Sequence, residues 1–410
     1  MSEAVAQQVD QPEFSLRSVA LAAYAPATLF GLAEGAMLPV IAASVIARGG
    51  DESIAALIAA MIGLGSIITN IPSGILATRI GERRAMLVAS LLTLLALVLC
   101  TINLGRGNGS LVLYGGGVFL IGCAGSVFTL ARQSYLTEVT PPHMRARALS
   151  TLGGTMRIGA FLGPFIAAGA MQLWGLHGAY YVSLGAIAVA AAVIFRVPDL
   201  EITEEQRQAA LEVTTTGILK RDWRLFLTLG TGVLLLNMIR QTRQVVIPLW
   251  AAHIGLPAST AALIYGVAGG IDALMFYPAG KVMDHCGRRA VAIPCVTIMA
   301  IAFLFMPLTH GVPTLMLVAV VIGLGNGCGS GIVMTLGADV SPAVGRPTFL
   351  GIWRELADGG AMLGPLLLSL MTAALGLGAG IALSGGAGFL AAGALWRWIP
   401  RPALAGADEV

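Results

Sequence analysis

The chain has 410 residues, of which 57% are hydrophobic and only 11% are charged, and its formal net charge is +3. A water-soluble chain of this composition could not cover its surface with polar groups, whereas a lipid bilayer is a suitable solvent for it. The composition therefore excludes a soluble protein, and the small positive charge is poor evidence for nucleic-acid binding.

Twelve apolar stretches follow one another along the chain. A helix needs about 20 apolar residues to cross roughly 30 Å of hydrocarbon. The predicted spans are 18–46, 53–77, 84–104, 110–137, 145–172, 178–197, 225–253, 257–281, 288–308, 312–337, 346–373 and 377–398. We therefore predict an all-α polytopic membrane protein with an N-terminal tail (1–17), a six-helix half (18–197), a central linker (198–224), a second six-helix half (225–398) and a C-terminal tail (399–410).

An arginine-rich turn occurs twice, once over residues 74–84 and again over 280–289, each time between two apolar stretches. A constant shift of 201 residues also places the Gly-Pro pair at 163–164 on the pair at 364–365. Aligned landmarks over this length indicate two homologous halves in parallel orientation. The chain is therefore expected to be an internal duplication.

The loop charges predict the orientation. Most of the 24 Lys and Arg residues fall in loops on one side, and only Arg48 and Arg106 fall in loops on the other. The positive-inside rule makes the first side cytoplasmic, so both termini are expected in the cytoplasm and the first span is expected to be a retained anchor. The 5 cysteines lack metal-ligand spacing, and no metal site is expected.

The twelve spans and the duplicated Gly-x-x-x-Asp-Arg-x-Gly-Arg-Arg turn resemble the major facilitator superfamily. The turn residues are Gly74, Thr78, Arg79, Gly81 and Arg83 in the first copy, and Gly280, Asp284, Gly287 and Arg288 in the second. The first glycine of each copy is expected to allow close helix approach, and the second is expected to reverse the chain. The resemblance implies that the acid locks one conformational state, yet Thr78 replaces it in the first copy.

The fifth span carries Gly159, Gly163 and Pro164, and is similar to the antiporter motif of the drug/proton antiporter branch, although Ala replaces both final glycines. The resemblance implies an exporter-type interface, and ordinary close packing of helices is the alternative. A similar motif recurs at 360–365. The branch also commonly has an arginine in the fourth span at the position of Val118. Proton coupling through that arginine is therefore excluded in this chain.

Nine charged residues lie well inside the predicted spans, away from the span ends that carry the loop charges. Because an arginine at the bilayer centre costs about 2.5–3.5 kcal/mol, they are expected to face a wet cavity or each other. The residues are Arg132, Arg157, Arg240, Arg243 and Arg354, with Glu34, Asp272, Glu355 and Asp358 as candidate partners. Arg354 and Asp358, four residues apart, are expected to share one helix face.

Glu34 is the first candidate for proton coupling and Asp272 is the second. A shift of 209 residues aligns Glu34 with Arg243, in two spans that line the central cavity in the resembled family. A permanent ion pair with Arg240 or Arg243 is the alternative for Glu34. We also expect Arg157 to contact Asp272 between the two halves.

The predicted substrate cavity joins a polar cluster in the seventh span to residues of the fourth and eleventh. Its residues are Arg132, Arg240, Gln241, Arg243, Gln244, Trp353, Arg354, Glu355 and Asp358. Trp353 is a candidate for stacking on substrate, and packing is the alternative.

The resemblance implies a secondary transporter that works by alternating access. We expect proton-coupled export of small organic or drug-like molecules, with uptake of an organic anion as the alternative and a non-transport membrane protein as a distant one. No nucleotide-binding loop occurs, so the proton gradient is the expected energy source and no cofactor is expected. No catalytic constellation indicates an enzyme. The expected partners are a small-molecule substrate, protons and the lipid bilayer, for a monomer in the cell membrane.

Overall fold

The computed structural model describes residues 23–105, 110–140, 145–197, 215–342 and 346–399. The two predicted tails, except for residue 399, and most of the linker lie outside these residues. Long helices dominate the described part of the chain, and 12 of them are long and apolar enough to cross a membrane. The predicted all-helical, twelve-span class is confirmed.

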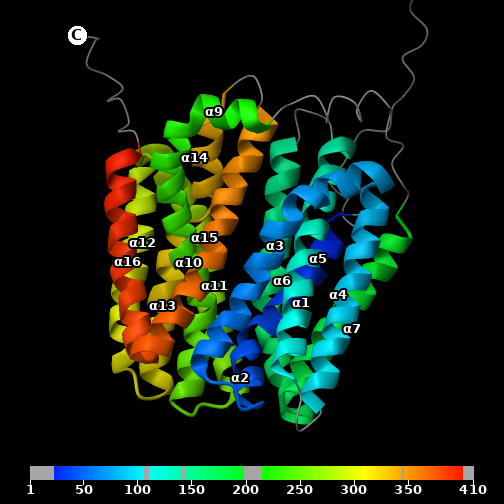
Figure 1. The fold of residues 1–410 in the computed structure, drawn as a ribbon, viewed down its shortest axis with the longest axis vertical. Coiled ribbons are helices and arrows are strands. Elements are labelled where there is room, and N and C mark those ends of the chain that lie inside the picture. Colours follow the sequence, from blue (N-terminus) through cyan, green and yellow to red (C-terminus); the bar gives the residue numbers. More distant parts are fainter. Residues whose placement is uncertain (1–22, 106–109, 141–144, 198–214, 343–345, 400–410) are drawn as a thin grey trace, which may run out of the picture.

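The first half contains α1 (Ala25–Met37), η2 (Leu38–Val40), α2 (Ile41–Ile46), α3 (Glu52–Ile80), α4 (Glu82–Gly105), α5 (Leu111–Val139), α6 (Arg145–Trp174) and α7 (His177–Phe195). The second half contains α9 (Thr215–Leu225), η4 (Phe226–Gly230), α10 (Thr231–His253), α11 (Ala258–Cys286), α12 (Arg289–Phe305), η5 (Met306–Leu308), α13 (Val312–Cys328), α14 (Ile332–Val340), α15 (Arg346–Leu375) and α16 (Leu377–Trp398). The two halves lie side by side, with α2 near one end of the bundle and α9 at the other (Figure 1).

Equivalent helix contacts in the two halves bear out the duplication. A Cβ added at Gly159 would overlap the backbone of Thr28, and one at Gly360 would overlap that of Leu234. The glycines are 201 residues apart and their partners are 206 apart. The pairs Gly122 with Ile62 and Gly323 with Ala268 repeat both shifts. These contacts correct the alignment of the first span: at a shift of 206, Glu34 corresponds to Arg240, and not to Arg243.

The two arginine-rich turns reverse the chain as predicted. Gly81 and Gly287 have φ of +88° and +84°, which favours glycine. Arg83 donates to the carbonyl oxygens of residues 194 and 195 at the end of α7, at 3.3 and 2.5 Å. Its counterpart, Arg289, donates to the Ile399 oxygen after α16 at 2.7 Å. The arginines therefore tie each turn to the last helix of its own half.

Other turn residues behave differently. The expected close approach at Gly280 is wrong, because a Cβ there would meet no atom within 4 Å. Arg288 forms a bidentate pair with Asp339 at 2.7 and 3.1 Å, and Arg79 is exposed at the end of α3. The side chains of Thr78 and Asp284, and the surroundings of Gly74, lie outside the described set, so the predicted latch stays a prediction.

The tenth span is not the continuous helix that we predicted. α13 ends at Cys328, Gly331 adopts φ of +79°, and α14 begins at Ile332. Three glycines in five residues, 327, 329 and 331, weaken the helix at this position. Non-helical backbone at membrane depth is tolerated where it lines a cavity or is buried in protein. The break therefore points to a functional region.

Candidate functional site

Glu34 lies where three adjoining cavities meet between the halves. The cavities have volumes of about 170, 170 and 230 Å³, and Glu34 lines each of them. Its side chain is partly buried, and the positive charge of Arg132 acts on its carboxylate, although within the described residues that carboxylate forms no hydrogen bond or ion pair. Gln241 and Gln244 face it across the first cavity. The structure thus gives Glu34 no permanent partner in Arg240 or Arg243.

Asp272 is held tightly in the third cavity. Its Oδ2 accepts hydrogen bonds from Arg243 Nη2 at 3.1 Å and from Asn326 Nδ2 at 2.7 Å, while its Oδ1 is buried without a hydrogen-bond partner. Asn326 in turn accepts from Arg240 Nε at 2.8 Å. The direct partner of Asp272 is thus Arg243, and Arg157, which we expected to contact it, lines the same cavity.

The broken tenth span completes this wall of the cavity. Arg240 Nη1 donates to the Gly329 carbonyl at 3.3 Å within the helix break, and the same carbonyl accepts from the Ile332 amide at the start of α14 at 3.3 Å. Arg157, from the other half, donates to Ser330 Oγ at 3.2 Å. Sequence reasoning missed Asn326 and Ser330, although the glycine-rich segment around them was a usable signal.

A second polar cluster joins the halves along α3 and α15. Asn70 Nδ2 donates to Asp358 Oδ2 at 2.7 Å, and Asp358 pairs with Arg354 at 3.8 Å, which confirms that the last two share one helix face. Arg354 also reaches Gln133 Oε1 on α5 at 3.3 Å, and Asn70 accepts from Ser126. Asn70, Ser126 and Gln133 were missed, and a single Asn in an apolar span was the available signal.

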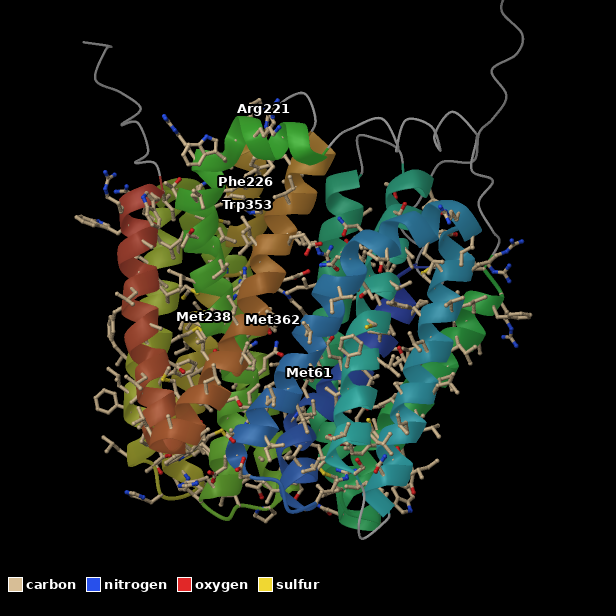
Figure 2. The ribbon with its side chains drawn as sticks, in the orientation of Figure 1. Met61, Arg221, Phe226, Met238, Trp353 and Met362 are labelled. Atoms are coloured by element: carbon tan, nitrogen blue, oxygen red, sulfur yellow. The ribbon has the colours of Figure 1, made fainter. Side chains whose placement is uncertain are left out.

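Three residues of the predicted substrate cavity lie outside the three cavities. Arg132 is 4% exposed, donates to Met156 Sδ at 3.6 Å, and leaves Nε and Nη1 without hydrogen-bond partners. Trp353 is 3% exposed and donates to the Val333 carbonyl at 2.9 Å. It packs in the second half near Phe226 and below α9 (Figure 2), which favours the packing alternative over stacking on substrate. Glu355 lies beside Asn70.

The glycines of the fifth span pack inside their own half. Gly159 and Gly163 face α1, as Gly360 and Gly364 face α10 in the other half. Because the same contact occurs in both halves, ordinary close packing of helices accounts for this feature. The contact between halves on this side is made instead by Phe161 and Phe165 against two glycines of α11.

The halves are joined at the end that carries α2. His253 Nδ1, at the end of α10, lies 2.5 Å from Glu52 Oε1 at the start of α3. Trp250 stacks on His253 with ring centroids 4.7 Å apart, and Ser369 donates to the Ser53 carbonyl at 2.7 Å. At the α9 end the two groups of helices are visibly separated (Figure 1). The structure is therefore closed at the α2 end.

Two homologous helical halves around a polar central cavity define a multi-pass membrane protein of the transporter class. The family model described as the Major Facilitator Superfamily matches residues 24–282 and 229–409. The chain belongs to the major facilitator superfamily. Membership of its drug/proton antiporter branch stays a prediction.

Similar proteins agree with this assignment. An uncharacterized MFS-type transporter, YfkF, of Bacillus subtilis (strain 168) is 31% identical over 178 residues, which are 43% of this chain and 44% of that protein. The chain thus matches less than half the length of this curated relative. The crystal structure of the nucleoside transporter NupG superimposes with a TM-score of 0.75 and 12% identity over 94% of this chain and 99% of that one. A D-xylose-proton symporter gives 0.74 and 18% over 94% and 98%. At these identities the structures support the fold alone.

Proposed function

We propose that the protein is a proton-coupled secondary transporter of small organic molecules, with Glu34 as the group that carries the proton. The observation that supports this role is the position where three cavities meet of a carboxylate that, within the described residues, forms no hydrogen bond or ion pair. A carboxylate in such a place can take up and release a proton without first breaking an ion pair. Asp272, in contrast, would lose its contacts with Arg243 and Asn326.

Alternating access fits the contacts between the halves. The pairs of His253 with Glu52 and of Ser369 with Ser53 close the α2 end. For this end to open, both contacts must break while the α9 end closes. By the positive-inside rule the α9 end is cytoplasmic, so we propose that the structure is an inward-facing state of a monomer in the cell membrane, with both termini in the cytoplasm.

Two directions of transport are candidates. Export of drug-like molecules by proton antiport rests on the similarity of the fifth span to the antiporter motif, whose glycines pack against α1 in this structure. Uptake of an organic anion by proton symport is favoured by the third cavity, where the described lining has three guanidinium groups, from Arg157, Arg240 and Arg243, and two carboxylates, from Asp272 and Glu34. A proton on Glu34 removes one negative charge and so strengthens the attraction for an anion.

Purified protein in liposomes with an internal pH-sensitive dye tests the proposal. A panel of organic carboxylates, amines and neutral compounds is added on one side, and proton movement is followed for each. The wild type is expected to move protons with at least one compound class, inward with a carboxylate in the symport case. Glu34→Gln is expected to abolish this movement while exchange of the same compound across the membrane persists.

Asp222→Asn is the control and should behave as wild type, because Asp222 is a partly buried acid on α9 that pairs with Arg221 and lines none of the three cavities. Undiminished proton movement in Glu34→Gln contradicts the assignment of the proton carrier. Transport that dissipates no pH gradient with any compound contradicts proton coupling itself.

A further inference from the structure

A long apolar groove runs between the halves on the side of α6 and α11. Its volume is about 600 Å³, within the range of small-molecule binding sites. Apart from Arg157, its lining is made of apolar side chains and glycines, chiefly Ile158, Phe161, Phe165, Val267, Ile271 and Leu274. Ile158 is 55% exposed and Leu274 is 73% exposed. In a membrane these side chains face the bilayer, so the groove is open to lipid.

The groove and the polar central cavity share three lining residues. Arg157 and Phe161 line both the groove and the third cavity, as does Ala273 on α11. Arg157 thus stands between an apolar space that opens to the bilayer and a polar space at the centre of the protein. Phe161 packs against Gly270 beside it. A molecule that filled both spaces would have a polar head at Arg157 and an apolar tail in the groove.

The opposite seam between the halves has no such opening among the described residues. There α3 and α15 touch so closely that a Cβ on Gly63 would lie 2.8 Å from Met362 Cα. The hydrogen bond from Asn70 to Asp358 ties the same two helices together. The lateral opening is therefore a property of the seam between α6 and α11.

The charge at the inner end of the groove selects the head group. Arg157 donates to Ser330 Oγ and is attracted by the charge of Asp272, while Arg240 donates to Asn326 Oδ1 and the Gly329 carbonyl. Arg243 is 9% exposed and its Nε is buried without a hydrogen-bond partner. With three guanidinium groups against two carboxylates, the cavity favours an anion over a cation.

We propose that the transported substrate is an amphipathic carboxylate, which passes laterally between the bilayer and the central cavity through the groove of α6 and α11. Its carboxylate binds at Arg157, and its hydrocarbon tail lies along Ile158, Phe165 and Leu274. This inference rests on the proposed transport function and names the substrate class of the same cavity. Binding at the groove can nevertheless be measured without any transport.

The test uses the full-length protein in nanodiscs of phosphatidylcholine, a lipid without net charge. A photoactivatable palmitate is crosslinked to the protein, and the labelled residues are mapped by mass spectrometry. Labelling is expected within residues 154–165 and 267–274. Unlabelled palmitate should suppress this labelling at a concentration at least tenfold lower than palmitamide, which has the same tail and an uncharged head. Arg157→Gln should remove this preference, and Ile158→Trp should reduce labelling severalfold.

Ile166→Trp is the matched control, because Ile166 lies on the same helix, is 46% exposed and does not line the groove. It should label as the wild type does. Equal competition by palmitate and palmitamide, labelling spread over all lipid-facing helices, or unchanged labelling of Ile158→Trp would each overturn the proposal. If groove labelling is obtained as expected but no compound moves protons, the proposed function fails and the binding site stands. If proton-coupled transport is observed but the groove is not labelled, the proposed function stands and the proposed binding site is overturned.

Discussion

The substitution Gly163→Ala tests the contact that positions Glu34. α6 crosses α1 at Gly163, where an added Cβ would lie 2.6 Å from the Ala36 backbone nitrogen. Ordinary contact begins at 3.4 Å, and the Leu32 carbonyl oxygen lies closer to this Cβ than the Ala36 nitrogen does, so the helices must separate by more than 0.8 Å, the shortfall at the nitrogen. The atom that Cβ meets belongs to the backbone and cannot rotate away. Overpacking of this kind costs about 1–3 kcal/mol.

The expected result is a melting temperature lowered by several degrees for the purified protein. A thiol-reactive dye measures it directly, because Cys100 and Cys295 are buried and become reactive on unfolding. Gly169→Ala is the control on the same helix: a Cβ there meets no atom within 4 Å, so the melting temperature should be unchanged or raised. If Gly163→Ala melts together with Gly169→Ala, the described crossing of α1 and α6 is wrong.

Two further substitutions address the cavity and a helix end. Asp272→Asn removes the carboxylate that pairs with Arg243, which is 9% exposed, and should destabilise the protein by about 3–5 kcal/mol. Asp272→Asn combined with Arg243→Gln should recover part of this loss in the same melting assay, and no recovery would argue against the pair. At the start of α3, hydrogen bonds from the Ile54 amide and the Ser53 hydroxyl lower the pKa of Asp51 below its ordinary value of 3.8. The ionised Asp51 carboxylate therefore stabilises the fold fully above that value, and this contribution is lost as the pH falls through the lowered pKa. Asp51→Ala should cost about 1 kcal/mol of folding free energy at neutral pH and progressively less below about pH 4. If the variant loses the same stability relative to wild type at about pH 3 as at about pH 7, this role of Asp51 is refuted.

Sequence patterns predicted the membrane spans well because the rule behind them is local. A bilayer requires about 20 apolar residues with satisfied backbone hydrogen bonds, and any segment that meets this condition forms a helix. Gly81 and Gly287 could be assigned to turns for a similar reason, since the chain must reverse between spans. The pairing of Arg354 with Asp358 also follows from spacing along one helix.

Contacts between helices could not be derived in this way. The choice of Arg243 as the direct partner of Asp272 depends on how α10 and α11 are rotated about their axes. Trp353 is of a residue type that often stacks on ligands. In the structure, however, it donates a hydrogen bond to a carbonyl of α14 and lies in the packed interior. Hydropathy does not predict how each helix is rotated or which side chains it buries, because membrane helices gain little from burying apolar surface against each other and associate through close van der Waals packing.

The sequence by itself determined the number of spans, the duplication and the inventory of charges that must avoid lipid, because each follows from the free energy of placing a residue in hydrocarbon. Only the tertiary structure decided which charges meet. Among the described residues it left Glu34 without a hydrogen bond or ion pair at the junction of three cavities, broke the tenth span beside Arg240 and Arg157, and formed an apolar groove along one seam between the halves. These features arise from packing between segments far apart in the chain, where sub-ångström fit selects one arrangement among many of similar hydrophobicity.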